Sequence, residues 1–107
     1  SYKADVLVRG DSIGYIGEVN ADTIRAEHVI NASGKVITPG FIDPHAHGDP
    51  LETPEFHNFL AMGVTTIVLG QDGSSPAVGA LNKWFAEVEA ENSAVNIALF
   101  SGHGSIR

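Results

Sequence analysis

The chain has 107 residues, of which 43% are hydrophobic and 18% charged, and its formal net charge at pH 7 is −7. This composition fits one small globular domain or a piece of a larger one, and it excludes a chain that is disordered throughout. The excess of acidic residues argues against binding to nucleic acid or anionic membranes. No apolar run approaches the roughly 20 residues of a membrane helix. The absence of cysteine excludes disulfide scaffolds and thiolate metal sites.

Residues 1–38 are predicted to form short β structure. Alternating valines predict a strand over residues 4–8, and Gly10-Asp11 indicates a turn into a return strand over residues 13–19. A further short strand is expected at Val29-Ile30. The sequence Thr-Pro-Gly at residues 38–40 then interrupts the β pattern.

Strands and helices are predicted to alternate after residue 39. Strands are expected over residues 41–43, 64–69 and 96–100, with the middle strand buried on both faces. One helix is expected to begin at Thr53-Pro54 and end at Gly63, and a second to begin at Ser75-Pro76. This order predicts an α/β fold with three parallel strands side by side and both helices on one face, as at the start of an α/β barrel or a doubly wound sheet.

His45 and His47 are the strongest candidates for chemistry, because they directly follow the predicted strand over residues 41–43. Residues two apart on an extended chain point to the same side, so both imidazoles are expected to face one point beyond the carboxyl end of this strand. Active sites of α/β barrels lie at that end. Two neighbouring imidazoles suit zinc or another borderline-soft divalent metal; the alternative is two polar loop histidines that meet by chance.

The next two predicted strands also end in polar segments. Asp72 follows the strand over residues 64–69, and His103 follows the strand over residues 96–100, with Arg107 four residues later. Three such endings in consecutive parallel strands indicate one site. Asp72 also fits a simple turn, because Asp-Gly is ordinary turn sequence. Arg107 suits a bidentate pair with a substrate carboxylate, and it equally suits a solvated surface charge.

A resemblance to the amidohydrolase superfamily begins at residues 39–47, which read PGFIDPHAH. In that superfamily a segment of the form P-G-[FL]-[IV]-D-x-H-x-H connects a small β-sandwich to a metal-bearing (β/α)8 barrel. Residues 63–68 resemble the second barrel strand, and residues 96–107 resemble the third-strand segment of the D-aminoacylase, or N-acyl-D-amino-acid deacylase, branch. The resemblance therefore implies part of a β-sandwich over residues 1–38 and the first three strands of an incomplete barrel over residues 39–107.

The same resemblance implies roles for individual residues. His45 and His47 would be metal ligands for one or two divalent ions, with zinc expected. The deacylase branch usually has G-N-C-G after the second strand, with the Cys as a metal ligand, whereas the segment here reads Gly-Gln-Asp-Gly. Asp72 therefore stands in the Cys position and would bind the metal through oxygen. His103 and Arg107 would contact polar groups of the substrate.

The resemblance implies a fragment of a metal-dependent hydrolase of C–N bonds, acting on a small-molecule amide such as an N-acyl-D-amino acid. A (β/α)8 barrel needs about 250 residues, and the family's general base and remaining ligands lie on later strands, so no catalytic base is expected here and the chain alone is expected to be inactive. We expect a cytoplasmic protein that binds the rest of its parent chain or self-associates, with no nucleic-acid or membrane partner. The alternative is a non-catalytic α/β binding or assembly module derived from the barrel.

Overall fold

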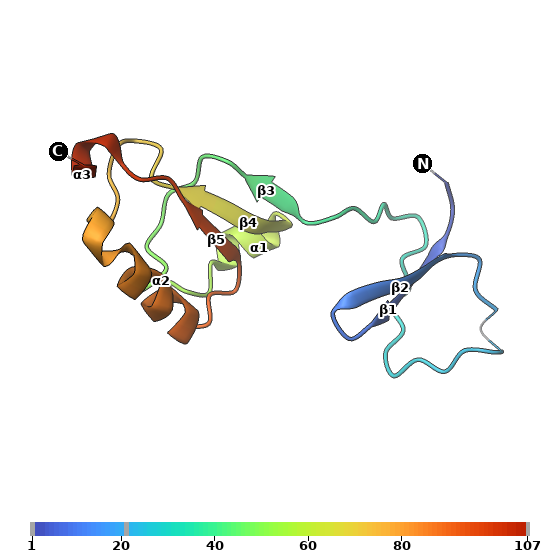
Figure 1. Cartoon of the computed structure of the whole chain (residues 1–107). Helices are drawn as coiled ribbons and strands as arrows, with labels where there is room; N and C mark the ends of the chain where they lie inside the picture. Colours follow the sequence, from blue (N-terminus) through green and yellow to red (C-terminus); the bar gives the residue numbers. More distant parts are fainter. Residues whose placement is uncertain (1, 21, 107) are drawn as a thin grey trace. The chain divides into compact units, whose positions relative to one another are not determined.

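A computed structural model of the chain describes residues 2–20 and 22–106. These residues form an α/β structure, as predicted, with small sheets and no closed barrel among the described residues. They fall into two compact units, Ser1–Ile37 and Thr38–Arg107. In chain order (Figure 1) the elements are β1 (Asp5–Arg9), β2 (Ser12–Gly17), β3 (Phe41–Asp43), α1 (His57–Ala61), β4 (Val64–Leu69), the 3₁₀ turn η1 (Val78–Ala80), α2 (Leu81–Ala90), β5 (Asn96–Leu99) and α3 (His103–Ile106).

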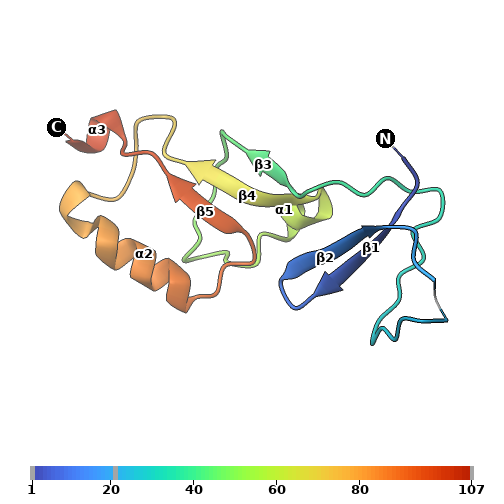
Figure 2. The same ribbon diagram turned by 45° about the vertical axis from the view of Figure 1, so that its right-hand side comes forward.

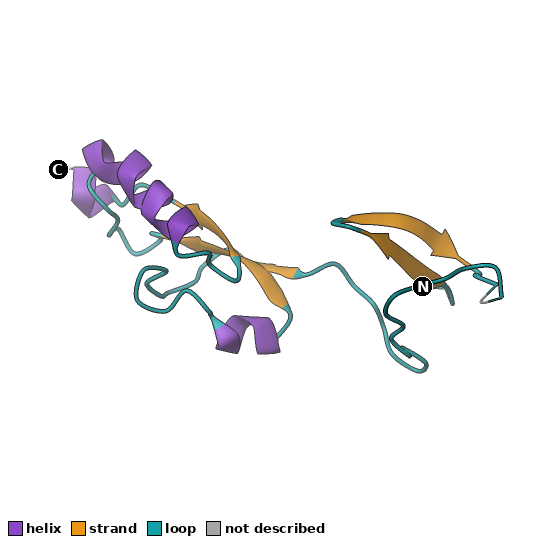
Figure 3. Cartoon of the chain, turned by 90° about the horizontal axis from the view of Figure 1, so that it is seen from below, coloured by secondary structure: helices purple, strands orange, loops and turns teal. Residues whose placement is uncertain are grey.

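The first unit contains one antiparallel hairpin. Strands β1 and β2 pair with Val6 opposite Ile16, and the turn between them uses Gly10 at a φ of 62°, a value that glycine adopts without steric cost. The prediction of a strand at Val29-Ile30 is wrong, because residues 22–40 contain no helix or strand (Figure 3). Both of these side chains are exposed. A pair of β-branched residues does not form a strand where no neighbouring strand satisfies its backbone groups.

The second unit is built on a parallel sheet in which β4 lies between β3 and β5 (Figure 2). Residue Phe41 pairs with Val64 on one side of β4, and Ile67 pairs with Ile97 on the other. The predicted arrangement of three parallel strands in chain order is confirmed. Parallel pairing places the three carboxyl ends at one edge of the sheet, where the loops that follow β3, β4 and β5 meet.

The core of this unit lies on one face of the sheet. Ile67 and Leu69 of β4 are buried and, being two apart, point to the same side. They form one cluster with four further buried residues, and Trp84 of α2 packs against it; these residues are Ala46, Phe56, Phe59 and Val95. The prediction that β4 is buried on both faces is wrong, because the alternate residues Val64, Thr66 and Val68 are only half-buried. Within the described residues, no second layer covers them.

Both helices begin later than their sequence signals indicated. Thr53 does not cap α1, because its hydroxyl donates to the carbonyl of Asp49, and the helix starts at His57 after Phe56 in a left-handed conformation. Ser75 likewise donates its hydroxyl to the carbonyl of Pro76 and does not cap α2, which begins at Leu81 after η1. The predicted helix end at Gly63 is confirmed, with a φ of 78° directly after the last turn. No helix in the described part of the chain has the length and apolar character to cross a membrane.

We expect the isolated chain to self-associate through the sheet of its second unit. Strand β3 is an edge strand, and its residues Phe41 and Ile42 are 55% and 66% exposed. An apolar edge strand offers unpaired backbone groups to another chain, and a lysine on such an edge opposes pairing. Sedimentation velocity should show dimers or larger species at high protein concentration. Ile42→Lys should shift the chain toward monomer, whereas Asn82→Lys at an exposed position of α2 should not. A monomer at all concentrations would contradict this expectation.

Candidate metal centre

The loop after β3 presents His45 and His47 on the same side. The carboxylate of Asp43 accepts a hydrogen bond from the backbone N–H of His45 at 3.0 Å, which turns the chain as the strand ends. The N–H of Ala46 then donates to the carbonyl of Val68 at 3.0 Å, and the Ala46 side chain is buried in the core. With Ala46 directed inward, the two flanking imidazoles lie outside with ring centroids 5.5 Å apart. The expected convergence of the two histidines is thus seen.

The loop after β4 places Asp72 against both imidazoles. One carboxylate oxygen of Asp72 lies 3.3 Å from Nε2 of His45, and the other lies 2.9 Å from Nε2 of His47. The three side chains are between 57% and 72% exposed. Exposed ion pairs contribute only about 0–1 kcal/mol to stability. The cluster therefore contributes little to the stability of the fold, and its ability to bind a metal ion is the property to consider.

These three side chains fit the ligand requirements of zinc. Each offers one nitrogen or oxygen donor, and the three donor atoms lie within 4.8 Å of one another. Ligands about 2.0–2.2 Å from a tetrahedral zinc ion lie about 3.3 Å apart, close to the observed His45–Asp72 and His47–Asp72 distances. Catalytic zinc sites use three protein ligands and keep a fourth position open. The group has the composition of such a site.

Hydrogen bonds join the loop after β4 to the segment after β5. The hydroxyl of Ser75 accepts from the N–H of Gly102 at 2.8 Å, and the hydroxyl of Ser105 both accepts from the N–H of Ser75 and donates to its carbonyl. The N–H of Gly104 donates to the carbonyl of Gly73 at 2.8 Å. The backbone that follows Asp72 is therefore held by the segment after β5.

Of the two residues expected to contact substrate, His103 lies within the described residues, and it is not in this group. His103 is exposed at the start of α3, and its ring nitrogens are not among the clustered donor atoms of the described residues. Arg107 lies outside the described residues. The assignment of both to substrate binding stays a prediction.

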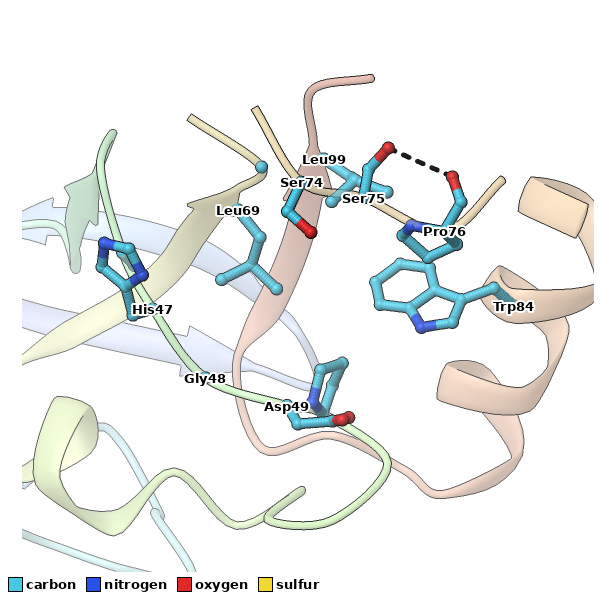
Figure 4. Close-up of a pocket in the computed structure, with 12 residues that line it drawn as sticks. His47, Gly48, Asp49, Leu69, Ser74, Ser75, Pro76, Trp84 and Leu99 are labelled. Carbon is cyan, nitrogen blue, oxygen red and sulfur yellow. Dashed lines mark hydrogen bonds between the residues drawn. The ribbon is translucent and has the colours of Figure 1, made fainter. Parts of the chain in front are cut away.

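A cavity of about 300 Å³ opens beside His47 (Figure 4). Leu69, Leu99 and Trp84 give it an apolar wall, and Asp49 and Ser74 contribute polar groups. Asp49 is held in a turn, since its carboxylate accepts from the N–H of Leu51 at 2.9 Å. Its volume is at the lower end of the range for small-molecule sites, about 300–1,000 Å³, and its lining is more polar than is usual for such sites.

Sequence reasoning missed the residues that hold the loops together. The side-chain amide of Gln71 donates to the carbonyls of Pro44 and Val68, the latter at 2.8 Å. Ser75 and Ser105 connect the second and third loops, as described above. Gln71 carried a weak signal, as a polar residue next to Asp72 at a strand end. The serines carried none, because their partners lie about 30 residues away along the chain.

The chain is similar to several curated proteins. It is 29% identical to an N-acyl-D-glutamate deacylase of Alcaligenes xylosoxydans xylosoxydans over 98% of the chain and 26% of the relative. It is 40% identical to a D-aminoacylase of the same organism over 70% of the chain and 16% of the relative. It is also 35% identical to an adenine deaminase of Bacillus velezensis over 88% of the chain and 16% of the relative. The chain thus spans about a quarter or less of each of these proteins. No family model and no solved structure matches it.

Proposed function

On the premise that this chain is a sequence relative of the amidohydrolases, we propose that it supplies part of the metal centre of a hydrolase that cleaves C–N bonds in N-acyl-D-amino acids. The observation that carries the proposal is the convergence of His45, His47 and Asp72 after two neighbouring strands. In this proposal residues 39–107 are the first strands of a (β/α)8 barrel, and residues 1–38 belong to a β-sandwich. The parallel order β3-β4-β5 and the carboxyl-end position of the three donors support it.

The three side chains would hold a divalent ion such as zinc, for which two imidazoles and one carboxylate are suitable ligands. Bound zinc polarises a carbonyl and lowers the pKa of a bound water, which is the chemistry that amide hydrolysis requires. The chain's own contribution is to orient the donors, because Asp43 fixes the turn before His45 and buried Ala46 fixes the side on which His45 and His47 lie. The cavity beside His47 would receive part of the substrate, and His103 and Arg107 would contact its polar groups.

The substrate class rests on the names of the relatives. Two of them are a deacylase of N-acyl-D-glutamate and a D-aminoacylase, and a third relative is an N-acyl-D-aspartate deacylase matched over 98% of the chain. The adenine deaminase among the relatives favours a second candidate, hydrolytic removal of ammonia from a purine. Both reactions break a C–N bond with water. The third candidate function is that of a non-catalytic binding module, which would turn over neither substrate.

The test uses the protein as its gene encodes it, purified after growth with zinc. N-acetyl-D-glutamate, N-acetyl-D-leucine and adenine are supplied separately, and the release of free amino acid or ammonia is measured. We expect free amino acid from the D-substrates and none above background from a His47→Ala variant. Ammonia from adenine alone would replace the deacylase proposal by the deaminase. No turnover of any substrate by the zinc-loaded protein would favour the binding module.

A further inference from the structure

The side chain of Gln71 bridges the two loops that carry the candidate ligands. Its amide nitrogen donates to the carbonyl of Pro44, which immediately precedes His45, and to the carbonyl of Val68 in β4 at 2.8 Å. Gln71 itself immediately precedes Asp72. One amide group therefore ties the backbone next to the first imidazole to the backbone next to the carboxylate.

We propose that Gln71 is a positioning residue that sets the distance between the histidine pair and Asp72, and with it the affinity of the site for a divalent metal. The bridge spans β3 and β4 where their regular pairing has ended, since the last paired residues are Asp43 and Ile67. Beyond that point, within the described residues, the two loops are joined by the bond from Ala46 to Val68, by the two bonds of Gln71 and by the contacts of Asp72 with the two imidazoles. Because so few contacts join the two loops, we expect the loops to move apart when the hydrogen bonds of Gln71 are removed.

The chemistry of the bridge requires an amide. Both acceptors are carbonyl oxygens, so only the NH₂ end of the side chain can face them, and both of its hydrogens are used. The amide oxygen is buried and has no hydrogen-bond partner among the described residues. A glutamate at position 71 would place a carboxylate against two carbonyl oxygens, which repel it. A methionine would fill a similar volume and donate no hydrogen bond.

This inference rests on the proposed metal site, and the experiment separates the two. Zinc is titrated calorimetrically into the wild-type chain, Gln71→Glu and Gln71→Met, with Asn82→Asp as a control for added charge at an exposed position of α2. The dissociation constant should rise about tenfold or more in both Gln71 variants, because loss of groups that orient ligands typically costs 10–100-fold in metal affinity. Asn82→Asp should match the wild type. Circular dichroism and urea unfolding establish that each variant is folded under the titration conditions.

Two readouts distinguish positioning from a general loss of stability. The visible spectrum of bound Co²⁺ reports ligand geometry, and it should change in Gln71→Met even at saturating metal. Gln71 is the single glutamine of the chain, so its side-chain NH₂ signals are readily assigned by NMR, and they should exchange with solvent more slowly than those of exposed Asn82. Zinc binding by the wild type with unchanged affinity in both folded Gln71 variants would overturn the positioning role alone. Absence of zinc binding in the wild type would overturn the metal site and this inference together.

Discussion

Replacing His45 and His47 together by alanine is expected to abolish zinc binding by this chain. The two imidazoles supply two of the three clustered donor atoms, and a lone carboxylate from Asp72 is a weak ligand for zinc. The loss should leave folding intact, since both rings are exposed and neither belongs to the core. Calorimetric zinc titration near neutral pH measures the effect, and urea unfolding verifies that stability is unchanged.

The control for this experiment is a second pair of histidines. His28 lies in the first unit and His57 at the start of α1, both are exposed, and neither is in the donor cluster. The variants His28→Ala and His57→Ala should bind zinc as the wild type does. Acid should weaken wild-type binding, because a proton and a metal compete for the same imidazole nitrogen. If the double variant at His45 and His47 binds zinc as tightly as the wild type, the assignment of the metal ligands is wrong.

The strands of the second unit could be predicted because their signal is local. Residues 64–69 combine β-branched and apolar side chains between two glycines, and that pattern is almost sufficient for a buried parallel strand. The position of the candidate site followed from the same pattern, since parallel strands bring their carboxyl ends to one edge. His45 and His47 were expected at this edge for that reason, whereas the ligand role of Asp72 came from the resemblance, because its local sequence also fits a simple turn.

The first residues of the helices could not be predicted because the capping side chains hydrogen-bond to competing acceptors. The hydrogen bonds between loops could not be predicted because their partners are distant in sequence. Thr53 is a residue type that is common at N-caps, yet its hydroxyl donates to the carbonyl of Asp49, and α1 starts four residues later. Gln71 has only a weak local signal, that of a polar residue at a strand end, because one of its two acceptors is a carbonyl 27 residues earlier. The burial of β4 was overestimated for a similar reason: a β-branched run indicates a strand that can be covered on both faces, and only tertiary packing decides whether it is.

Gly102 is the residue at which a single added methyl group is expected to disturb both the fold and the site. A Cβ atom on Gly102 would lie 2.6 Å from the carbonyl carbon and oxygen of Gly73 and 2.7 Å from the carbonyl carbon of Ser74. These are backbone atoms, so no side-chain rotation relieves the contact. The N–H of Gly102 also donates to the hydroxyl of Ser75, and this bond tethers the loop that carries Asp72.

Gly102→Ala should therefore lower the free energy of unfolding by about 1–3 kcal/mol, the usual cost of inserting a methyl group into a closely packed site. The zinc dissociation constant should rise as well, because relief of the contact displaces the backbone beside Asp72. Gly79→Ala is the matched control: its Cβ would have no heavy atom within 4 Å, and its φ is not positive. That variant should be neutral or slightly stabilised, since alanine restricts the unfolded chain. Urea unfolding and zinc titration of both variants make the comparison, and equal stability of the two would show that the loops after β4 and β5 are not packed as described.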